Sequence, residues 1–321
     1  MTDDRSRRSK SFRWLRTLAT LGVVGTALYY LGRNLVEGLS QIDIEVCLSR
    51  WPLLLASGVL TEFCVFLGTR SYHLIVRGVG GHLPYPRSAR VHLVSNLGQF
   101  MPGYGWQQAG KVYLASKEGV PVREGSVAMV VEQGTLACAG LTVAALTFSP
   151  SWSWVPSVLH RTTYQIVVAA ALILALLLLP EALRRAGGLA RKWGRPGWEL
   201  DVGRRALWSA AGVLLLSWTL FGLAFALVAG AFHPLDAQGV AICVFTLVAS
   251  VLFGWAIPFV PGGIGVREGA MAFLLAAIMP NAIASLVAIV MRLVLVICEV
   301  FAALVVWLVT RREARITQTG Y

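Results

Sequence analysis

The residues best suited to chemistry interrupt an apolar stretch at 257–269. Arg267 and Glu268 stand side by side there, after a short run that is rich in proline and glycine: Pro261, Gly262, Gly263, Ile264 and Gly265. Proline blocks a helix, and glycine permits the positive φ of a sharp turn. Charges inside an apolar environment are costly unless they are paired or hydrated, so such charges are functional candidates. We therefore expect the working centre of the protein in this stretch.

The same stretch has the features of an anion site. The first N–H groups of a helix are unpaired, and the helix dipole is positive there, so a glycine-rich turn before a helix can bind an anion. An arginine nearby can donate two parallel hydrogen bonds to a phosphate. We expect a phosphate-bearing head group to contact the backbone of 262–266 and the side chain of Arg267.

The first half of the chain contains a similar interruption around Pro102 and Gly103. Lys111 follows it, and we expect this side chain to reach the same cavity from the other side. Gln107 and Gln108 either line a polar path or cap the broken backbone. This region is therefore the second part of the expected site.

Further charges lie inside the apolar helices that follow each interruption. Glu132 and Arg292 occupy nearly equivalent places in the two halves, and we expect them to pair, either as part of the site or as a purely structural salt bridge. Glu299 lies seven residues after Arg292, two turns along the same face, and both are expected to point inward. Glu62 and Glu299 are candidates for coupling to an ion, although a neutral, hydrogen-bonded Glu62 is an equal alternative.

Composition restricts the class of protein. The chain has 321 residues, of which 56% are hydrophobic and 14% charged, and several apolar runs reach the roughly 20 residues that cross a bilayer. The net charge of +12 is distributed in short segments between these runs, as in orientation signals, which argues against nucleic-acid binding. No catalytic, nucleotide-binding or metal-ligand motif is present, so no cofactor is expected. We assign His73 and His92 to the membrane interface.

The chain is expected to be an all-α polytopic membrane protein. A single membrane domain, 12–310, lies between a disordered basic tail, 1–11, and a second tail, 311–321. Two re-entrant or broken helical hairpins are expected within 88–118 and 237–279. About six full spans complete the domain: 12–32, 51–76, 122–148, 162–180, 206–232 and 281–310. The excess of Arg and Lys in alternate loops predicts cytoplasmic N- and C-termini, and we expect the plasma membrane of a prokaryote.

The two halves of the chain resemble each other. Four residues of the first half recur in the second half at one constant offset (259 − 100 = 159). The matching residues are Phe100 and Phe259, Pro102 and Pro261, Gly103 and Gly262, and Pro121 and Pro280. The predicted helices follow the same offset, and the topology then inverts one repeat (about 12–150) relative to the other (about 160–310). Inverted repeats with broken helices are typical of alternating-access transporters. The alternative is an ordinary helix bundle with two proline kinks.

The run from Pro261 to Glu268, with Arg292 in the next helix, resembles a signature of the lysylphosphatidylglycerol synthase transmembrane family. The first half resembles that family in Pro102 and Gly103. It departs from the family pattern in the residues that follow: Trp106, Gln107, Gln108, Lys111 and the pair Glu132-Gln133. The resemblance covers most of 12–310.

The resemblance implies a role in moving or handling lipids between leaflets, such as aminoacylated phospholipids or polyprenyl-linked sugars. It also implies that this chain, without the soluble aminoacyl-transfer domain, does not synthesise lysylphosphatidylglycerol. We therefore expect a non-enzymatic flippase for lipids with anionic or phosphate head groups. Two alternatives remain: a polyprenyl-phosphate-dependent membrane transferase, using Asp43 and Glu45 on an outer loop, and an accessory subunit of a lipid-modifying enzyme. An oligomer or a partner enzyme is compatible with each.

Overall fold

The computed structural model describes residues 49–101, 105–148, 202–257 and 263–319, together with Arg33, Val260 and scattered positions between 166 and 185. For 311–319 the description is of the backbone. Every regular element in this part of the chain is helical. In chain order, the elements are α3 (Trp51–Gly78), α4 (Tyr85–Asn96), the 3-10 helix η1 (Leu97–Phe100), α5 (Trp106–Lys117), α6 (Val122–Thr147), α8 (Arg204–Phe232), α9 (Ala237–Ala256), α10 (Val266–Leu275) and α11 (Asn281–Thr319).

Five of these helices are long and apolar enough to cross a membrane: α3, α6, α8, α9 and α11. Four of them confirm predicted spans, and α9 was expected as one arm of a hairpin. The predicted helix 12–32 lies outside the described residues, and the described positions within 162–180 are helical. The protein is an all-α polytopic membrane protein.

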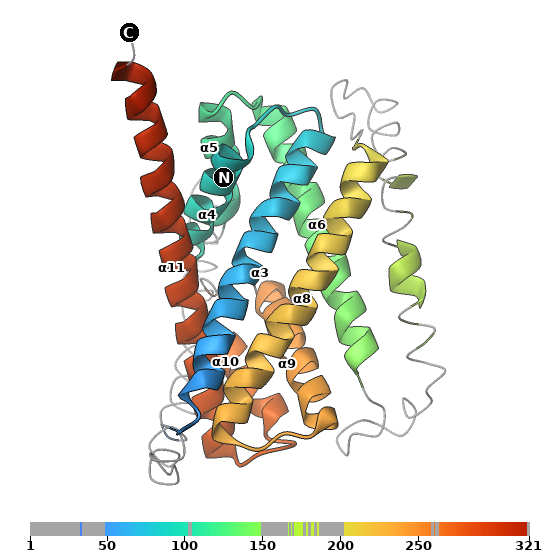
Figure 1. The fold of residues 1–321 in the computed structure, drawn as a ribbon. Helices are drawn as coiled ribbons and strands as arrows, with labels where there is room; N and C mark the ends of the chain where they lie inside the picture. Colours follow the sequence, from blue (N-terminus) through green and yellow to red (C-terminus); the bar gives the residue numbers. More distant parts are fainter. Residues whose placement is uncertain are drawn as a thin grey trace, which may run out of the picture.

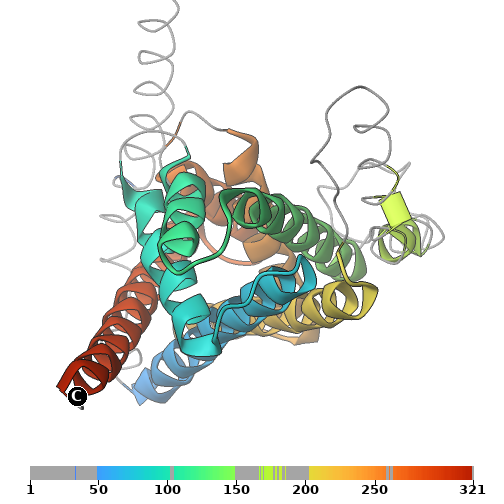
Figure 2. The same ribbon diagram turned by 90° about the horizontal axis from the view of Figure 1, so that it is seen from above.

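The long helices run nearly parallel to one another along the length of the molecule (Figure 1). Seen from above, α3 and α8 lie side by side, while α11 and α6 lie on either side of the α4–α5 hairpin (Figure 2). Helix α11 continues to Thr319, beyond the end expected at residue 310. Its apolar, span-forming part ends at Thr310, so the extension carries the basic C-terminal residues away from the apolar bundle.

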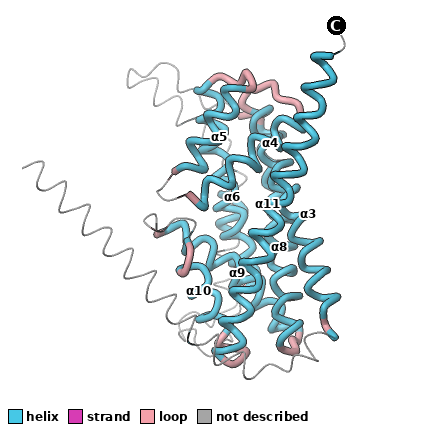
Figure 3. Tube along the Cα trace, turned by 90° about the vertical axis from the view of Figure 1, so that its left-hand side faces the viewer, coloured by secondary structure: helices cyan, strands magenta, loops and turns pink. Residues whose placement is uncertain are grey.

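The two interrupted segments form hairpins at opposite ends of the molecule. The α4–η1–α5 hairpin lies at the end where α11 finishes, and α10 lies toward the other end (Figure 1). The segments that precede α5 and α10 face each other about halfway along the molecule (Figure 3). Each of these helices is preceded by a glycine with positive φ, Gly105 at 93° and Gly265 at 82°. A residue with a Cβ atom is strained there, so glycine is needed to turn the chain back.

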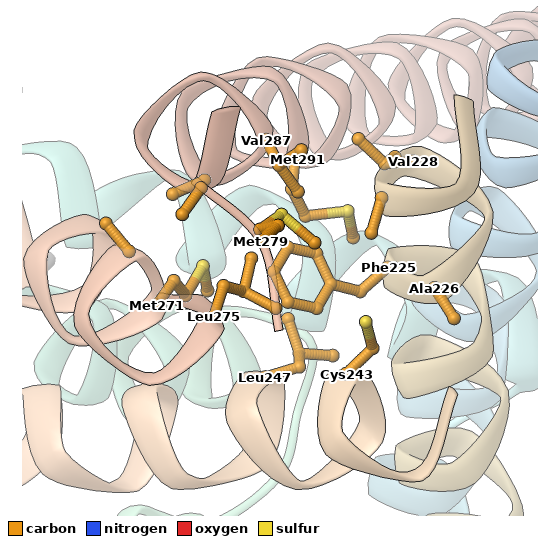
Figure 4. Packing of buried hydrophobic residues seen from close by; sticks show 14 of the residues in the cluster. Phe225, Ala226, Val228, Cys243, Leu247, Met271, Leu275, Met279, Val287 and Met291 are labelled. Atoms are coloured by element: carbon orange, nitrogen blue, oxygen red, sulfur yellow. The ribbon is translucent and has the colours of Figure 1, made fainter. Parts of the chain in front are cut away.

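A hydrophobic core holds the second hairpin in place. Phe225 of α8 packs among Leu247 of α9, Leu275 of α10 and Met291 of α11 (Figure 4). Methionine side chains from α10, α11 and the segment between them fill the irregular space around the ring. Helices α8 and α9 approach closely, because a Cβ atom at Gly222 would lie 2.8 Å from the Val244 Cα atom. The hairpin is therefore fixed against the long helices.

Candidate functional site

A cavity of about 440 Å³ lies between the two hairpins. Its described lining comes from the turn of the first hairpin, from α6, from the end of α9 and from the turn before α10. The side chains in this lining that carry polar atoms are Gln99, Trp106, Gln107, Gln108, Gln133, Trp255 and Arg267. The structure therefore brings Gln107, Gln108 and Arg267 together, as expected from the sequence.

Arg267 extends between two glycines. A Cβ atom at Gly254 would lie 2.6 Å from the Arg267 Cγ atom, and one at Gly263 would lie 2.8 Å from the Nε atom. Real Cβ atoms do not come this close to a neighbour, so both positions require glycine for the arginine to keep its place. The two backbones thus clamp the stem of the side chain beside the cavity.

Arg267 is buried and forms no direct ion pair with another described residue. The residue is 7% exposed, and its Nε atom has no hydrogen-bond partner. No ion pair to Arg267 forms within the residues that the structure describes. An unsatisfied buried donor costs free energy, and buried charges are normally paired. An anion in the adjoining cavity would supply the missing acceptor.

The neighbouring carboxylate has a different role. The Glu268 Oε2 atom accepts a hydrogen bond from the Gly265 backbone N at 2.6 Å, which caps the start of α10. Its Oε1 atom lies 3.3 Å from the Arg292 Nε atom. Glu268 therefore fixes the helix start and pairs with Arg292, so that it does not neutralise Arg267 directly.

The cavity has the electrostatics of an anion site. Its described lining holds one cation and four glutamine amides, and none of the lining residues in this part of the chain is acidic. Amide groups can donate hydrogen bonds without adding charge, although Gln99 and Gln107 direct their NH₂ groups to Glu299 and Asn96. The expected contacts from Pro102, Gly103, Pro261 and Gly262 lie outside the described residues.

The remaining charges of the first half form a separate buried cluster. The Lys111 Nζ atom lies 2.7 Å from Glu132 Oε2, and the His92 Nδ1 atom lies 3.1 Å from Glu132 Oε1. Lys111 is 2% exposed and Glu132 3%. Two expectations are thereby corrected: Lys111 is absent from the lining of the cavity, and Glu132 pairs with Lys111 and His92 rather than with Arg292. Each carboxylate pairs with a cation from its own half of the chain.

The two histidines, predicted at the membrane interface, are buried among the helices. His92 is buried within the Lys111–Glu132 cluster, and His73 is buried on α3, where its Nδ1 atom lies 3.0 Å from Ser88 Oγ. Helix α4 is polar on average, which favours the interface in the sequence, but its packing against α3, α5 and α11 buries one face.

The turn of the first hairpin contacts the last helix of the second half. The Gln99 Nε2 atom donates a hydrogen bond to Glu299 Oε2 at 2.9 Å, and the Arg292 guanidinium lies 5.7 Å from the centre of the Phe100 ring. Glu299 also lines a smaller cavity beside the first. Glu62 is half-buried on α3, and its Oε1 atom has no hydrogen-bond partner.

Several important residues carry no sequence signal. Gly254 is one glycine within an apolar helix, and Gln99 is an ordinary polar residue near a turn. Their roles depend on contacts between helices far apart in the sequence. The offset between the halves would have drawn attention to one of them, since Gln99 is adjacent to the matched Phe100.

Replacement of Gly254 by alanine is expected to weaken anion binding by about tenfold. The added Cβ atom displaces the Arg267 stem, and a shift of about 1 Å is enough to degrade a charge-assisted contact. Anion affinity of the purified protein measures the effect. Gly134→Ala is the matched control, because a Cβ atom at Gly134 meets nothing within 4 Å although Gly134 lines the same cavity. Equal affinities for the two variants would contradict the clamp.

Comparison with known proteins identifies the family. The model of the lysylphosphatidylglycerol synthase TM region matches residues 14–311. This chain belongs to that family. Members of the lysylphosphatidylglycerol synthase transmembrane family have a membrane domain related to lipid functions, and the match includes both hairpins and the cavity between them. No curated protein matches the chain.

Proposed function

We propose that this protein is a flippase that moves a lipid with an anionic head group, either a phospholipid or a polyprenyl-phosphate-linked lipid, between the two leaflets. The observation that carries the proposal is Arg267, a buried cation with an unsatisfied donor, beside a cavity whose described lining is otherwise neutral. The head group occupies this cavity, and the acyl or prenyl chains remain in the bilayer. The lipid leaves chemically unchanged.

The proposed inverted repeat is consistent with movement between leaflets. Helices α6 and α11 begin at Val122 and Asn281, and this separation (281 − 122 = 159) equals the offset between the matched prolines. The two hairpins lie toward opposite ends of the molecule (Figure 1). Transporters built from inverted repeats bind substrate near the midplane, between discontinuous helices. A site between two opposed hairpin turns can open alternately to each side.

We propose that both termini lie in the cytoplasm of a prokaryotic cell. Basic residues gather at the end of the molecule that holds the α4–α5 hairpin, including Arg87 and Arg90 of that hairpin and Arg204 at the start of α8. An excess of Arg and Lys marks the cytoplasmic side of a membrane protein. The first hairpin then enters from the cytoplasm and the second from outside.

Two experiments test the function. Native mass spectrometry of the purified protein should reveal co-purified lipids with anionic head groups. Proteoliposomes that contain such a lipid, fluorescently labelled in the head group, should lose inner-leaflet label faster than protein-free vesicles. A purified chain that moves no anionic lipid, but regains transport or activity with a co-purifying enzyme, would favour the accessory-subunit hypothesis. The transferase hypothesis depends on Asp43 and Glu45, which lie outside the described residues.

A further inference from the structure

A chain of hydrogen bonds connects the buried ionic cluster to the anion cavity. His92 Nδ1 lies 3.1 Å from Glu132 Oε1, and on the other side of the ring, His92 Nε2 lies 3.2 Å from Asn96 Nδ2. The Gln107 Nε2 atom donates to Asn96 Oδ1 at 2.8 Å. Gln107 also lines the cavity that contains Arg267. His92, Asn96 and Gln107 therefore form a relay between two charged sites.

The orientation assigned to the Asn96 amide corresponds to one protonation state of His92. Because Asn96 Nδ2 can only donate, His92 Nε2 must accept and carries no proton. The Nδ1 atom then carries the proton and donates a hydrogen bond to Glu132 Oε1 at 3.1 Å, so the Lys111 Nζ atom 3.4 Å away does not donate to it. In this arrangement of hydrogen bonds, the imidazole of His92 is neutral. Since Gln107 uses its Nε2 group for Asn96, the carbonyl end of its amide is left for the cavity.

Protonation of His92 would reverse the relay. A proton on Nε2 would face the NH₂ group of Asn96. Because both groups are donors, the hydrogen bond between them is lost and both remain buried without an acceptor. Rotation of the Asn96 amide restores the contact by presenting Oδ1 to His92. Gln107 must then rotate as well, since it now meets the Asn96 NH₂ group. The Gln107 NH₂ group thereby turns from the relay to the cavity, where it can donate to an anion.

We propose that His92 is the proton-binding site of a proton–anion co-transport step, with Asn96 and Gln107 as positioning residues that transmit its protonation to the cavity. This inference rests on the proposed function and names a co-substrate for the same site. One proton binds at His92 Nε2 when an anion enters, and it leaves when the anion is released. No covalent bond of the lipid changes.

The groups that surround His92 are consistent with a proton site. Lys111 of α5 and Glu132 of α6 contact the ring, and Tyr72 of α3 lies 5.5 Å away between ring centres. With Lys111 and Glu132 paired, a neutral His92 leaves the cluster without net charge. A proton on His92 makes the cluster positive, and an anion in the cavity balances that charge.

A second cavity offers the proton a path. Its volume is about 160 Å³, enough for several waters, and its lining includes His92, Asn96, Cys64 of α3 and Glu299 of α11. Glu299, one of the two coupling candidates expected from the sequence together with Glu62, lines this same cavity. Water in this cavity would connect the carboxylate of Glu299 to the imidazole. The relay thus has a proton-accessible cavity on one side and the anion cavity on the other.

Sulfate binding to the purified full-length protein tests the inference. Sulfate carries two charges throughout the range between about pH 5 and 8 in which histidine titrates, so any pH dependence belongs to the protein. We expect the wild-type Kd for sulfate to fall as the pH is lowered, by up to about tenfold per pH unit, because one proton is bound with each anion. Isothermal titration calorimetry at several pH values measures this slope.

Three variants separate the relay from other causes. In His92→Gln the amide copies the neutral imidazole, donating to Glu132 and accepting from Asn96, so we expect weak, pH-independent binding at the level of wild type at high pH. Asn96→Leu interrupts the relay but leaves the ionic cluster intact, and it should also remove the pH dependence. His73→Gln is the matched control, because His73 is buried beside Ser88 and outside the relay. It should keep the wild-type slope.

Different negative results would overturn different parts of the proposal. Sulfate binding that needs Arg267 but shows no pH dependence would overturn the proton site and leave the anion cavity standing. A wild-type slope retained in Asn96→Leu would do the same. Absence of sulfate binding at every pH, or binding unaffected by Arg267→Met, would overturn the proposed function and the co-transport step with it.

Discussion

Replacement of Arg267 by methionine is expected to abolish lipid translocation without lowering the stability of the protein. Methionine keeps the apolar stem that packs between Gly254 and Gly263, and it removes only the guanidinium group. Loss of a buried charge-assisted contact costs about 2–5 kcal/mol, which weakens anion binding by at least about thirtyfold. Proteoliposome translocation and sulfate affinity measure the functional loss.

The stability of Arg267→Met distinguishes a binding role from a structural one. Within the described residues Arg267 forms no ion pair, and its Nε atom lacks a partner, so the charge is a cost to the empty protein. Its removal should leave the thermal unfolding temperature unchanged or raise it, as is common when a binding site is neutralised. A lower unfolding temperature together with normal translocation would show that Arg267 is structural.

Two further variants calibrate the result. Arg267→Lys keeps the charge but cannot present the planar fork that matches a phosphate, so translocation should fall between wild type and Arg267→Met. Arg123→Ala removes an exposed arginine at the start of α6 and should leave translocation unchanged. A loss in Arg123→Ala equal to that in Arg267→Met would mean that general surface charge controls the assay.

The spans and turns could be predicted from the sequence because their causes are local. Apolar runs of sufficient length predicted α3, α6, α8 and α11, and proline and glycine predicted where the hairpins turn. Arg267 could be assigned to the site for the same reason, since the glycine-rich turn, the helix start and the arginine are adjacent in the chain. Such features depend on near neighbours only.

The charge pairs could not be predicted, because they depend on packing between helices. Lys111 and Glu132 lie on adjacent helices, α5 and α6, and nothing in their spacing excludes the alternative pair with Arg292. His92 is the clearest case, because α4 is polar enough to suggest the interface, yet three neighbouring helices bury its inner face. The relay that follows from its burial has no counterpart in the sequence.

The largest loss of stability is expected from Glu132→Gln. The Lys111 ammonium group is 2% exposed and lies 2.7 Å from the Glu132 carboxylate. The variant leaves this cation buried without a counter-charge among the described residues, and breaking a buried ion pair from one side costs about 3–5 kcal/mol. We expect the thermal unfolding temperature in detergent to fall by roughly 10 °C.

The double variant Lys111→Met/Glu132→Gln should recover much of this loss. Removal of both charges also removes the cost of their desolvation, and apolar replacements of a buried pair are often neutral. Glu118 supplies the comparison: its side chain is 11% exposed, but its partners Arg87 and Arg90 are 59% and 34% exposed, so solvent screens these pairs and their loss should cost less than that of Lys111–Glu132. Equal losses in Glu118→Gln and Glu132→Gln, or no recovery in the double variant, would show that burial of the Lys111–Glu132 pair does not control stability.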